Sequence, residues 1–360
     1  MSYERPNIRR MRGYAPGEQP QSTAPIKLNT NENPYPPAAA VLEAVHGIDA
    51  ETLRRYPSPT SAAFRAAAAR IHAIASDNLV CTNGGDELLR LAITTFVEPG
   101  RPVGMAEPSY SLYPVLAAIH GSPVERVELR RDWSLPEDFA ARMNAAGVQL
   151  TFLVNPHAPS GTLYPADEVA ALAAALDGVL LVDEAYVDFV DPVRGHDTLP
   201  LIRAHDNLLV LRTLSKGYSL AGLRFGYGVG AADLIAPIAE KTRDSYSVDA
   251  IAERAAIAAV EHRAEAAETW AAVRQSRSAL AAELESLGLP CAPSESNFLL
   301  AQIPEGVGGG AEAIYRALKA QDIIVRYFDQ PRLRDRLRIS VGTPEQNGKL
   351  LSALRSIVRG

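Results

Sequence analysis

The stretch LLVLRTLSKGYSLAGLRFGYGVG, residues 208–230, decides the fold of this chain. Its apolar start is long enough for a buried strand, and Thr213, Ser215 and Lys216 follow. Only five of the 36 basic residues are lysines, so a lysine directly after a buried strand differs from the arginine-rich surface. A partly desolvated lysine has a lowered pKa and can form a Schiff base with a carbonyl. The ordinary alternative is a solvated loop lysine.

The residues around this lysine suit a phosphorylated aldehyde. Hydroxyls precede it, and Arg224 follows eight residues later, which together would bind a phosphate monoester. Residues 215–227, SKGYSLAGLRFGY, resemble the pyridoxal-phosphate (PLP) motif S-K-x-x-x-L-A-G-L-R-x-G-Y/F of fold-type-I aminotransferases, most closely the histidinol-phosphate aminotransferase family. The resemblance implies that Lys216 carries PLP and that Ser215 and Arg224 bind its phosphate.

Composition narrows the class of protein. A chain of 360 residues with 47% apolar content predicts two domains and a large core. The net charge of −6 and the absence of a basic run argue against a nucleic-acid partner. Cys81 and Cys291 give neither a disulfide framework nor metal-ligand spacing. No apolar run approaches the ~20 residues of a membrane helix, and the polar N-terminus lacks a signal-peptide pattern. We expect a cytoplasmic protein without metal or membrane partner.

The order of elements predicts an α/β fold. Strands at 102–106, 124–129, 149–154 and 178–182 alternate with helices, which is typical of a mostly parallel sheet with helices on its faces. By resemblance, residues 41–250 form a large PLP-binding domain and 251–360 a smaller α/β domain. Residues 1–40, rich in proline, form an arm that packs with the smaller one. The alternative for the arm is a disordered tail.

Polar side chains follow three buried strands and should meet at one edge of the sheet. These are Asn155, Asp183 and Lys216, with Tyr186 three residues after the aspartate. A carboxylate at a pyridine nitrogen keeps that nitrogen protonated, so that the ring can accept electrons. In isolation, the aspartate could simply begin a helix and the asparagine a turn. The resemblance implies that Asp183 pairs with the PLP nitrogen, while Asn155 and Tyr186 contact its ring oxygen.

Further cofactor contacts are predicted at five other residues. Gly85, Asp86 and Glu87 form a glycine turn between a strand and a helix, and a helix N-terminus favours an anion. Tyr110 leaves a strand end and is placed either to stack on a flat ring or to pack in the core. The resemblance implies that it stacks on PLP. It also implies that Tyr56 reaches the cofactor phosphate of the partner subunit in a homodimer with a shared active site.

The substrate side is predicted from the arm and the C-terminal domain. Arg326 and Arg338, either of which alone could be surface charge, match family arginines that hold the anionic end of the substrate. Tyr14 and Asn33 are expected at the mouth of the site. The family pattern N-P-N-N-P-T-G is N-P-H-A-P-S-G here. His157 and Ala158 could alter the neighbouring substrate wall, and His157 is interpreted as structural rather than catalytic.

These assignments predict a PLP-dependent transaminase. Lys216 would act as general base and acid between the substrate and the cofactor. The favoured amino donor is L-histidinol phosphate, with 2-oxoglutarate as the acceptor. An aromatic amino acid aminotransferase, a phosphothreonine decarboxylase and a non-catalytic PLP-binding regulator are the alternatives. The regulator lacks support because no DNA-binding domain is appended and no catalytic position is missing.

Overall fold

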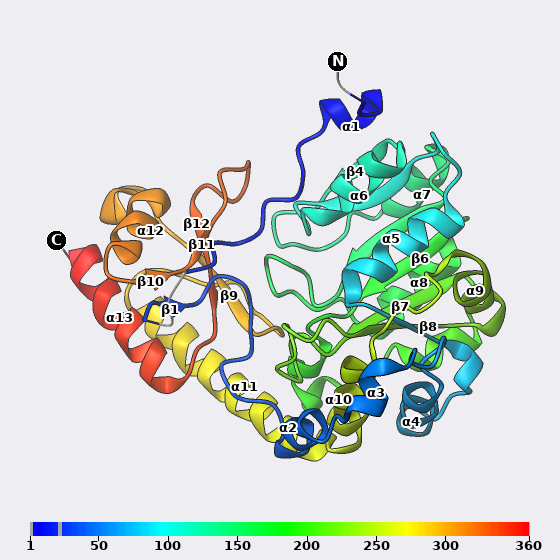
Figure 1. Ribbon diagram of the computed structural model, residues 1–360. Coiled ribbons are helices and arrows are strands. Elements are labelled where there is room, and N and C mark those ends of the chain that lie inside the picture. The colour runs from blue at the N-terminus through cyan, green and yellow to red at the C-terminus, as the bar shows by residue number, and fades with distance from the viewer. Residues whose placement is uncertain (1–2, 21–23, 360) are drawn as a thin grey trace.

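The computed structural model describes residues 3–20 and 24–359. Residues 1–2 and 21–23 of the predicted arm, and residue 360, lie outside the described part. The chain forms a larger group of elements around one sheet and a smaller group that contains the C-terminal helix (Figure 1). The expectation of a fold-type-I α/β architecture is confirmed, with a central sheet in which most neighbouring strands are parallel.

The central sheet has seven strands in the order β2-β8-β7-β6-β5-β3-β4. β3 to β7 pair in parallel, whereas β8 runs antiparallel between β2 and β7. The strands are β2 (Leu79–Thr82), β3 (Val103–Glu107), β4 (Val124–Glu128), β5 (Leu150–Val154), β6 (Val179–Asp183), β7 (Leu208–Thr213) and β8 (Gly226–Gly230). β8 was not predicted, because its glycines interrupt the apolar pattern. A Cβ at Gly226 would lie 2.7 Å from the carbonyl carbon of Gly84, so this position requires glycine.

Helices cover both faces of this sheet (Figure 1). One buried cluster joins the sheet to α4, α7, α8 and α10, and a second joins it to α5, α6 and α9. The helices of this part are α2 (Ala39–His46), α3 (Ala50–Arg54), α4 (Ala62–His72), α5 (Gly85–Phe96), α6 (Leu112–His120), α7 (Phe139–Ala145), α8 (Ala166–Ala175), α9 (Ala232–Pro237) and α10 (Ala250–Glu261). Burial on both faces explains why the inner parallel strands β3, β5, β6 and β7 are mostly apolar, whereas the edge strand β4 alternates apolar and charged residues.

The smaller unit has its own core around a three-stranded antiparallel sheet. Its elements are α11 (Arg263–Ser286), β9 (Phe298–Gln302), α12 (Ala311–Lys319), β10 (Ile323–Ile324), β11 (Arg326–Tyr327), β12 (Arg336–Ser340) and α13 (Pro344–Arg359). The strand predicted at 323–327 is two strands: β10 pairs with the arm, and β11 pairs with β12.

The N-terminal arm touches both units. Its strand β1 (Ile26–Lys27) pairs in parallel with β10 of the smaller unit. Its first helix α1 (Pro6–Arg10) lies against α6, where Asn7 donates a hydrogen bond to the carbonyl of Ala118 at 2.9 Å. The division of the chain at residues 40 and 250 stays a prediction. In the structure α10 packs against α2 and α4, whereas the later part of α11 belongs to the smaller core.

Candidate active site

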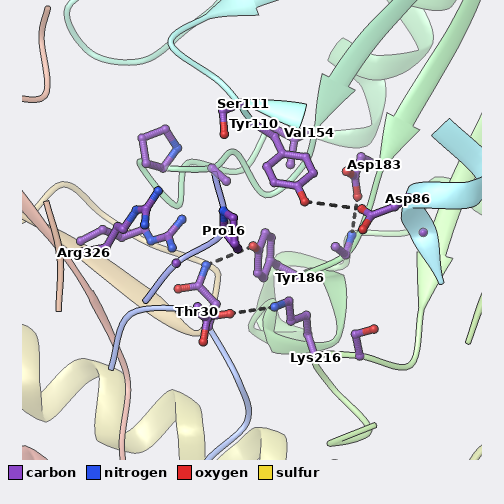
Figure 2. A pocket seen from close by; sticks show the side chains of 18 of the residues that line it. Pro16, Thr30, Asp86, Tyr110, Ser111, Val154, Asp183, Tyr186, Lys216 and Arg326 are labelled. Atoms are coloured by element: carbon purple, nitrogen blue, oxygen red, sulfur yellow. Dashed lines mark hydrogen bonds between the residues drawn. The ribbon is translucent and has the colours of Figure 1, made fainter. Parts of the chain in front are cut away.

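A cavity of about 440 Å³ lies where the carboxyl ends of the central strands meet the arm and the smaller unit. Figure 2 shows side chains from all three regions pointing into it. The predicted residues that line this cavity are Tyr14, Gly85, Asp86, Tyr110, Asp183, Tyr186, Thr213, Ser215, Lys216, Arg224, Arg326 and Arg338. The fold therefore brings most of the predicted site together from positions more than 300 residues apart.

Lys216 follows the end of β7 and extends across the floor of the cavity. Its Nζ donates a hydrogen bond to the backbone carbonyl of Thr30, over 2.9 Å (Figure 2). Burial, together with the nearby positive charge of Arg338, lowers the pKa of this amine to about 8. A sizeable fraction of the amine is therefore neutral near physiological pH, which is the form that attacks a carbonyl.

Asp183 is the last residue of β6 and is buried in the cavity wall. Its carboxylate accepts hydrogen bonds from the Tyr113 hydroxyl at 2.9 Å and from the backbone N–H of Ala185 at 3.1 Å. Burial raises the pKa of this carboxyl to about 6, and the bond from Tyr113 opposes the rise. Asp183 therefore remains mostly ionised at neutral pH and can hold a cationic ring nitrogen.

The opposite end of the cavity floor has the features of a phosphate site. α5 begins there at Gly85, so its first backbone N–H groups are available to an anion. Nη1 of Arg224 lies 3.4 Å from Oγ of Ser215, and Nη2 lies 3.4 Å from a carboxylate oxygen of Asp86. Close packing holds this corner, since a Cβ at Gly84 would lie 2.6 Å from Nη2 of the arginine.

Two hydroxyl-bearing residues complete the floor and wall. Oγ1 of Thr213 donates a hydrogen bond to Oγ of Ser215 at 2.9 Å. The Tyr110 hydroxyl lies 3.4 Å from Asp86 (Figure 2). Its ring meets the Tyr113 ring edge to face at 5.4 Å. Burial raises the pKa of Tyr110, so the phenol stays neutral and its ring can serve as an apolar wall.

Two arginines from the smaller unit face this floor. Arg326 and Arg338 are paired residues of the antiparallel strands β11 and β12. The guanidinium of Arg338 donates to the Asn29 carbonyl at 2.8 Å and lies 5.3 and 5.4 Å from the Phe298 and Phe328 ring centres. Its Nε has no hydrogen-bond partner. Within residues 3–20 and 24–359, neither arginine forms an ion pair, so both charges are free for an anion.

Three predicted residues have their side chains engaged elsewhere. Glu87 accepts a hydrogen bond from the Asn83 backbone N–H at 2.6 Å, at the start of α5. Asn33 donates to the Gly217 carbonyl and to Thr269 rather than into the mouth of the site. Each polar group has a protein partner here and neither residue lines the cavity, so the two ligand roles stay predictions.

Asn155 is the third of these residues. Its side-chain amide donates to the carbonyl of Tyr164 and accepts from the backbone N–H of the same residue, both at 2.9 Å. The amide is fully buried and lies outside the cavity lining. In this arrangement Asn155 secures the loop that follows β5, and its contact with a ring oxygen stays a prediction.

Tyr56 lies far from the cavity of its own chain. Its side chain is 82% exposed and stacks on Tyr246 with ring centres 4.5 Å apart. Its role in a partner subunit stays a prediction. His157 is fully buried, and its ring nitrogens contact Ser160 and the Pro108 carbonyl, which fits the structural interpretation. Ala158 does line the cavity.

Several residues that line or support the cavity were missed from the sequence. Thr30 contributes a backbone carbonyl, Asn31 donates to the Tyr186 hydroxyl at 3.0 Å, and Tyr113 holds Asp183. Phe328 comes from a loop of the smaller unit. The signal in the sequence for Asn31 is the polar segment LNTNEN, residues 28–33, in which it lies.

Comparison with known proteins agrees with this geometry. Residues 23–354 match the family model for aminotransferase class I and II. The chain belongs to this family. It is 44% identical to histidinol-phosphate aminotransferase 1 of Trichormus variabilis, over 99% of both chains. A crystal structure of histidinol-phosphate aminotransferase from Sinorhizobium meliloti, in complex with pyridoxal-5'-phosphate, superposes with a TM-score of 0.91 at 26% identity, covering 100% of this chain and 98% of that one.

These matches confirm the resemblance found in the sequence: a fold-type-I, PLP-dependent aminotransferase family. L-threonine-O-3-phosphate decarboxylase from Porphyromonas gingivalis also superposes, with a TM-score of 0.79 at 20% identity over 93% of this chain and all of that one. At that identity the likeness shows the fold alone. No helix within the described residues is both long and apolar enough to span a membrane.

The cavity fits PLP on its own chemistry. The buried, ionised carboxylate of Asp183 matches a protonated ring nitrogen, and the amine of Lys216, with its lowered pKa, matches an aldehyde. The helix N-terminus beside Arg224 matches a phosphate. Asp183, Lys216 and Ser215 would therefore hold the three ends of the cofactor. Tyr110 would cover its ring.

Proposed function

We propose that this aminotransferase transfers the amino group of L-histidinol phosphate to 2-oxoglutarate, giving imidazole-acetol phosphate and L-glutamate. The observation that carries the proposal is the pair Arg326 and Arg338, two cations without anionic partners in the described chain that face the lysine across the cavity. A phosphate monoester brings close to two negative charges and three acceptor oxygens. The relatives named histidinol-phosphate aminotransferase support the same donor.

The chain's own residues divide the work of the reaction. Lys216 would hold the cofactor through its amine and would move a proton to and from the substrate carbon. Asp183 holds the positive charge of the ring nitrogen. Arg338 binds the anionic end of donor and acceptor in turn, while Arg326 adds a second contact to a phosphate. Bound PLP supplies the electron sink for carbanion formation.

A second candidate is an aromatic amino acid as the donor. Aromatic rings border the substrate side, because Tyr14 lies edge to face with Tyr110 at 6.0 Å and Phe328 lies under both arginines. These rings would accept a phenyl as readily as an imidazole. A phosphothreonine decarboxylase would use the same arginines but would release carbon dioxide.

A donor panel separates these functions. The purified holoenzyme is assayed with histidinol phosphate, histidine, phenylalanine, tyrosine and phosphothreonine, and both the keto product and carbon dioxide are measured. We expect the highest kcat/KM for histidinol phosphate, formation of glutamate from 2-oxoglutarate, and no carbon dioxide. A preference for phenylalanine or tyrosine would favour the second candidate, and release of carbon dioxide would favour the decarboxylase.

We further infer that the active protein is a cytoplasmic homodimer in which Tyr56 serves the partner's site. Its exposed ring and the neighbouring exposed Leu53, on α3, support a buried interface in the dimer. Mixing Tyr56→Ala with Lys216→Ala subunits tests this. A hybrid should contain one site with both defects and one intact site, so activity should reappear. If Tyr56 acts within its own chain, each hybrid site carries one defect and no activity returns.

A further inference from the structure

Asn31 links the Tyr186 hydroxyl to the smaller unit. The residue lies in the arm with a φ of 56°, a left-handed conformation that asparagine tolerates better than most side chains. Its Nδ2 lies 3.0 Å from the Tyr186 hydroxyl, and its Oδ1 lies 2.9 Å from Oγ of Ser340 on β12. Its carbonyl accepts a bond from Asn297 at 2.9 Å. The arm, the larger unit and the smaller unit therefore meet at this one residue.

Ser340 determines which way the amide points. Its Oγ accepts a hydrogen bond from the Asn31 backbone N–H at 2.9 Å, and its own proton is donated to Oδ1 of the same residue. Within the described chain, Oδ1 of Asn31 is the only acceptor for the proton of the Ser340 hydroxyl. If the amide were flipped, a buried hydroxyl proton would lose its partner, at the cost of an unsatisfied polar group. The NH2 group must therefore face Tyr186.

This polarity leaves Tyr186 with its own proton to donate. The phenol oxygen accepts from Asn31, so its O–H points elsewhere, and the residue lines the cavity. The charged and titratable groups that act on the phenol are Arg338, Asp183, Tyr14, Tyr110 and Tyr113, and the Phe298 ring packs against its edge. None of these accepts a recorded bond from it within residues 3–20 and 24–359. Burial raises the pKa of Tyr186, which keeps the donor proton in place.

We propose that Asn31, locked by Ser340, is a positioning residue that makes Tyr186 a hydrogen-bond donor into the cavity, toward the ring oxyanion of bound PLP. The inference rests on the proposed cofactor site. A donor to that oxyanion weakens its hold on the proton of the adjacent lysine–cofactor linkage, and so lowers the pKa of the linkage. Through Ser340, the smaller unit thereby influences the protonation of the lysine–cofactor linkage, which is held mainly by residues of the larger unit.

The test reverses the amide polarity with an isosteric change. Asn31→Asp keeps the shape but offers only acceptors, so Tyr186 would turn its proton away from the cofactor. The readout is the pH midpoint of the visible absorption of the bound cofactor, without substrate. Tyr186→Phe should raise this midpoint by about one unit, the shift expected for one hydrogen bond to a charged group. Asn31→Asp should raise it by a similar amount.

The double variant separates hydrogen-bond polarity from the added charge. In the Tyr186→Phe background, Asn31→Asp should cause no further shift, because the two changes remove the same bond. An equal shift in both backgrounds would show a direct charge effect and would overturn the proposal, as would an unchanged midpoint in Asn31→Asp alone. Ser340→Ala frees the Asn31 amide to rotate and should give a smaller shift of the midpoint in the same direction. If Ser340→Ala caused no shift, the proposed role of Ser340 in orienting the amide would be contradicted.

Two controls keep the result interpretable. Asn347→Asp changes another buried asparagine whose amide is bonded at both ends, to the backbone of Gly342, outside the cavity. Its midpoint should equal that of the unchanged protein, and thermal unfolding of both Asn→Asp variants shows whether they fold. If Tyr186→Phe leaves the midpoint unchanged, the tyrosine does not face the cofactor. In that case the predicted contact of Tyr186 with the cofactor fails, independently of Asn31, while the binding of the cofactor by Lys216 stands.

Discussion

The charged side chains on the two walls of the cavity differ in their partners. On the large-domain wall, Asp183 is held by Tyr113 and a backbone N–H, and Arg224 lies beside Asp86. On the small-unit wall, Arg338 and Arg326 pack on aromatic rings and have no carboxylate partner within the described chain. The first wall is rigidly arranged at strand ends, while the second keeps a surplus of positive charge.

Other arginines that are largely withdrawn from solvent differ from this pair, because each has a carboxylate partner. Arg212 is paired with Glu184 at 2.6 Å, and Arg277 with Glu295 at 3.0 Å. A buried cation without such a partner is expensive, and burial accordingly lowers the pKa of Arg338. We infer that the first wall is arranged for a permanent cofactor, and that the second tolerates an unpaired charge because a changing anionic substrate supplies the partner.

The largest expected effect is on the first wall. Lys216→Ala should abolish transamination, because no other amine lines the cavity within the described residues. The unchanged protein should be yellow, and borohydride reduction should fix the cofactor to the peptide that contains Lys216. Peptide mapping by mass spectrometry gives the result. Attachment at Lys27 or Lys241 would contradict the assignment of this wall.

Asp183→Asn should bind cofactor but lose rate by the equivalent of about 4–6 kcal/mol in the barrier, because the ring nitrogen loses the charge that keeps it protonated. Asp188→Asn is the matched control. Asp188 is a buried carboxyl whose pKa burial also raises to about 6, but it lies outside the cavity. Single-turnover kinetics should show a far smaller loss in the control. Equal losses would mean that buried charge in general, and not contact with the ring, matters here.

The second wall should discriminate between donors. Arg326→Ala should lower kcat/KM for histidinol phosphate more than for phenylalanine, by the equivalent of roughly 1.5–3 kcal/mol in transition-state free energy. The reason is that a phosphate can use two arginines, whereas a carboxylate needs one. Arg338→Ala should damage use of every donor. Arg316→Ala removes an exposed arginine of α12, paired with Glu312, and should leave all donors unaffected. Equal losses across donors in Arg326→Ala would remove the basis for a phosphorylated donor.

The smallest effect concerns coupling between the walls. The pKa of Lys216 lies near 8, below its usual 10.5, so its neutral form predominates above pH 8 and is lost as pH falls through that value. The rate at which cofactor-free protein captures PLP should therefore rise with pH, with a midpoint near 8. Arg338→Met removes one of the causes of the lowered pKa and should move the midpoint upward. A midpoint that does not move would show that burial alone accounts for the shift.

Part of the site could be predicted because its residues follow strand ends in a known order. Asp183 and Lys216 come directly after apolar runs, and parallel strands bring such positions to one edge. Asn155 occupies an equivalent place but turns to the Tyr164 backbone, which the pattern could not reveal. Likewise, the apolar run at 323–327 gave no sign that it serves two sheets.

The sequence by itself determined the α/β class, the PLP lysine motif and the family, because these depend on local patterns and on spacing along the chain. The tertiary structure decided which polar groups remain free. Glu87, Asn33 and Asn155 are hydrogen-bonded to other protein groups, whereas Asn31, Tyr113 and the Thr30 carbonyl contact functional side chains. Hydrogen-bond partners in a folded chain come from distant segments, and only their packing determines which donors and acceptors are left for a ligand.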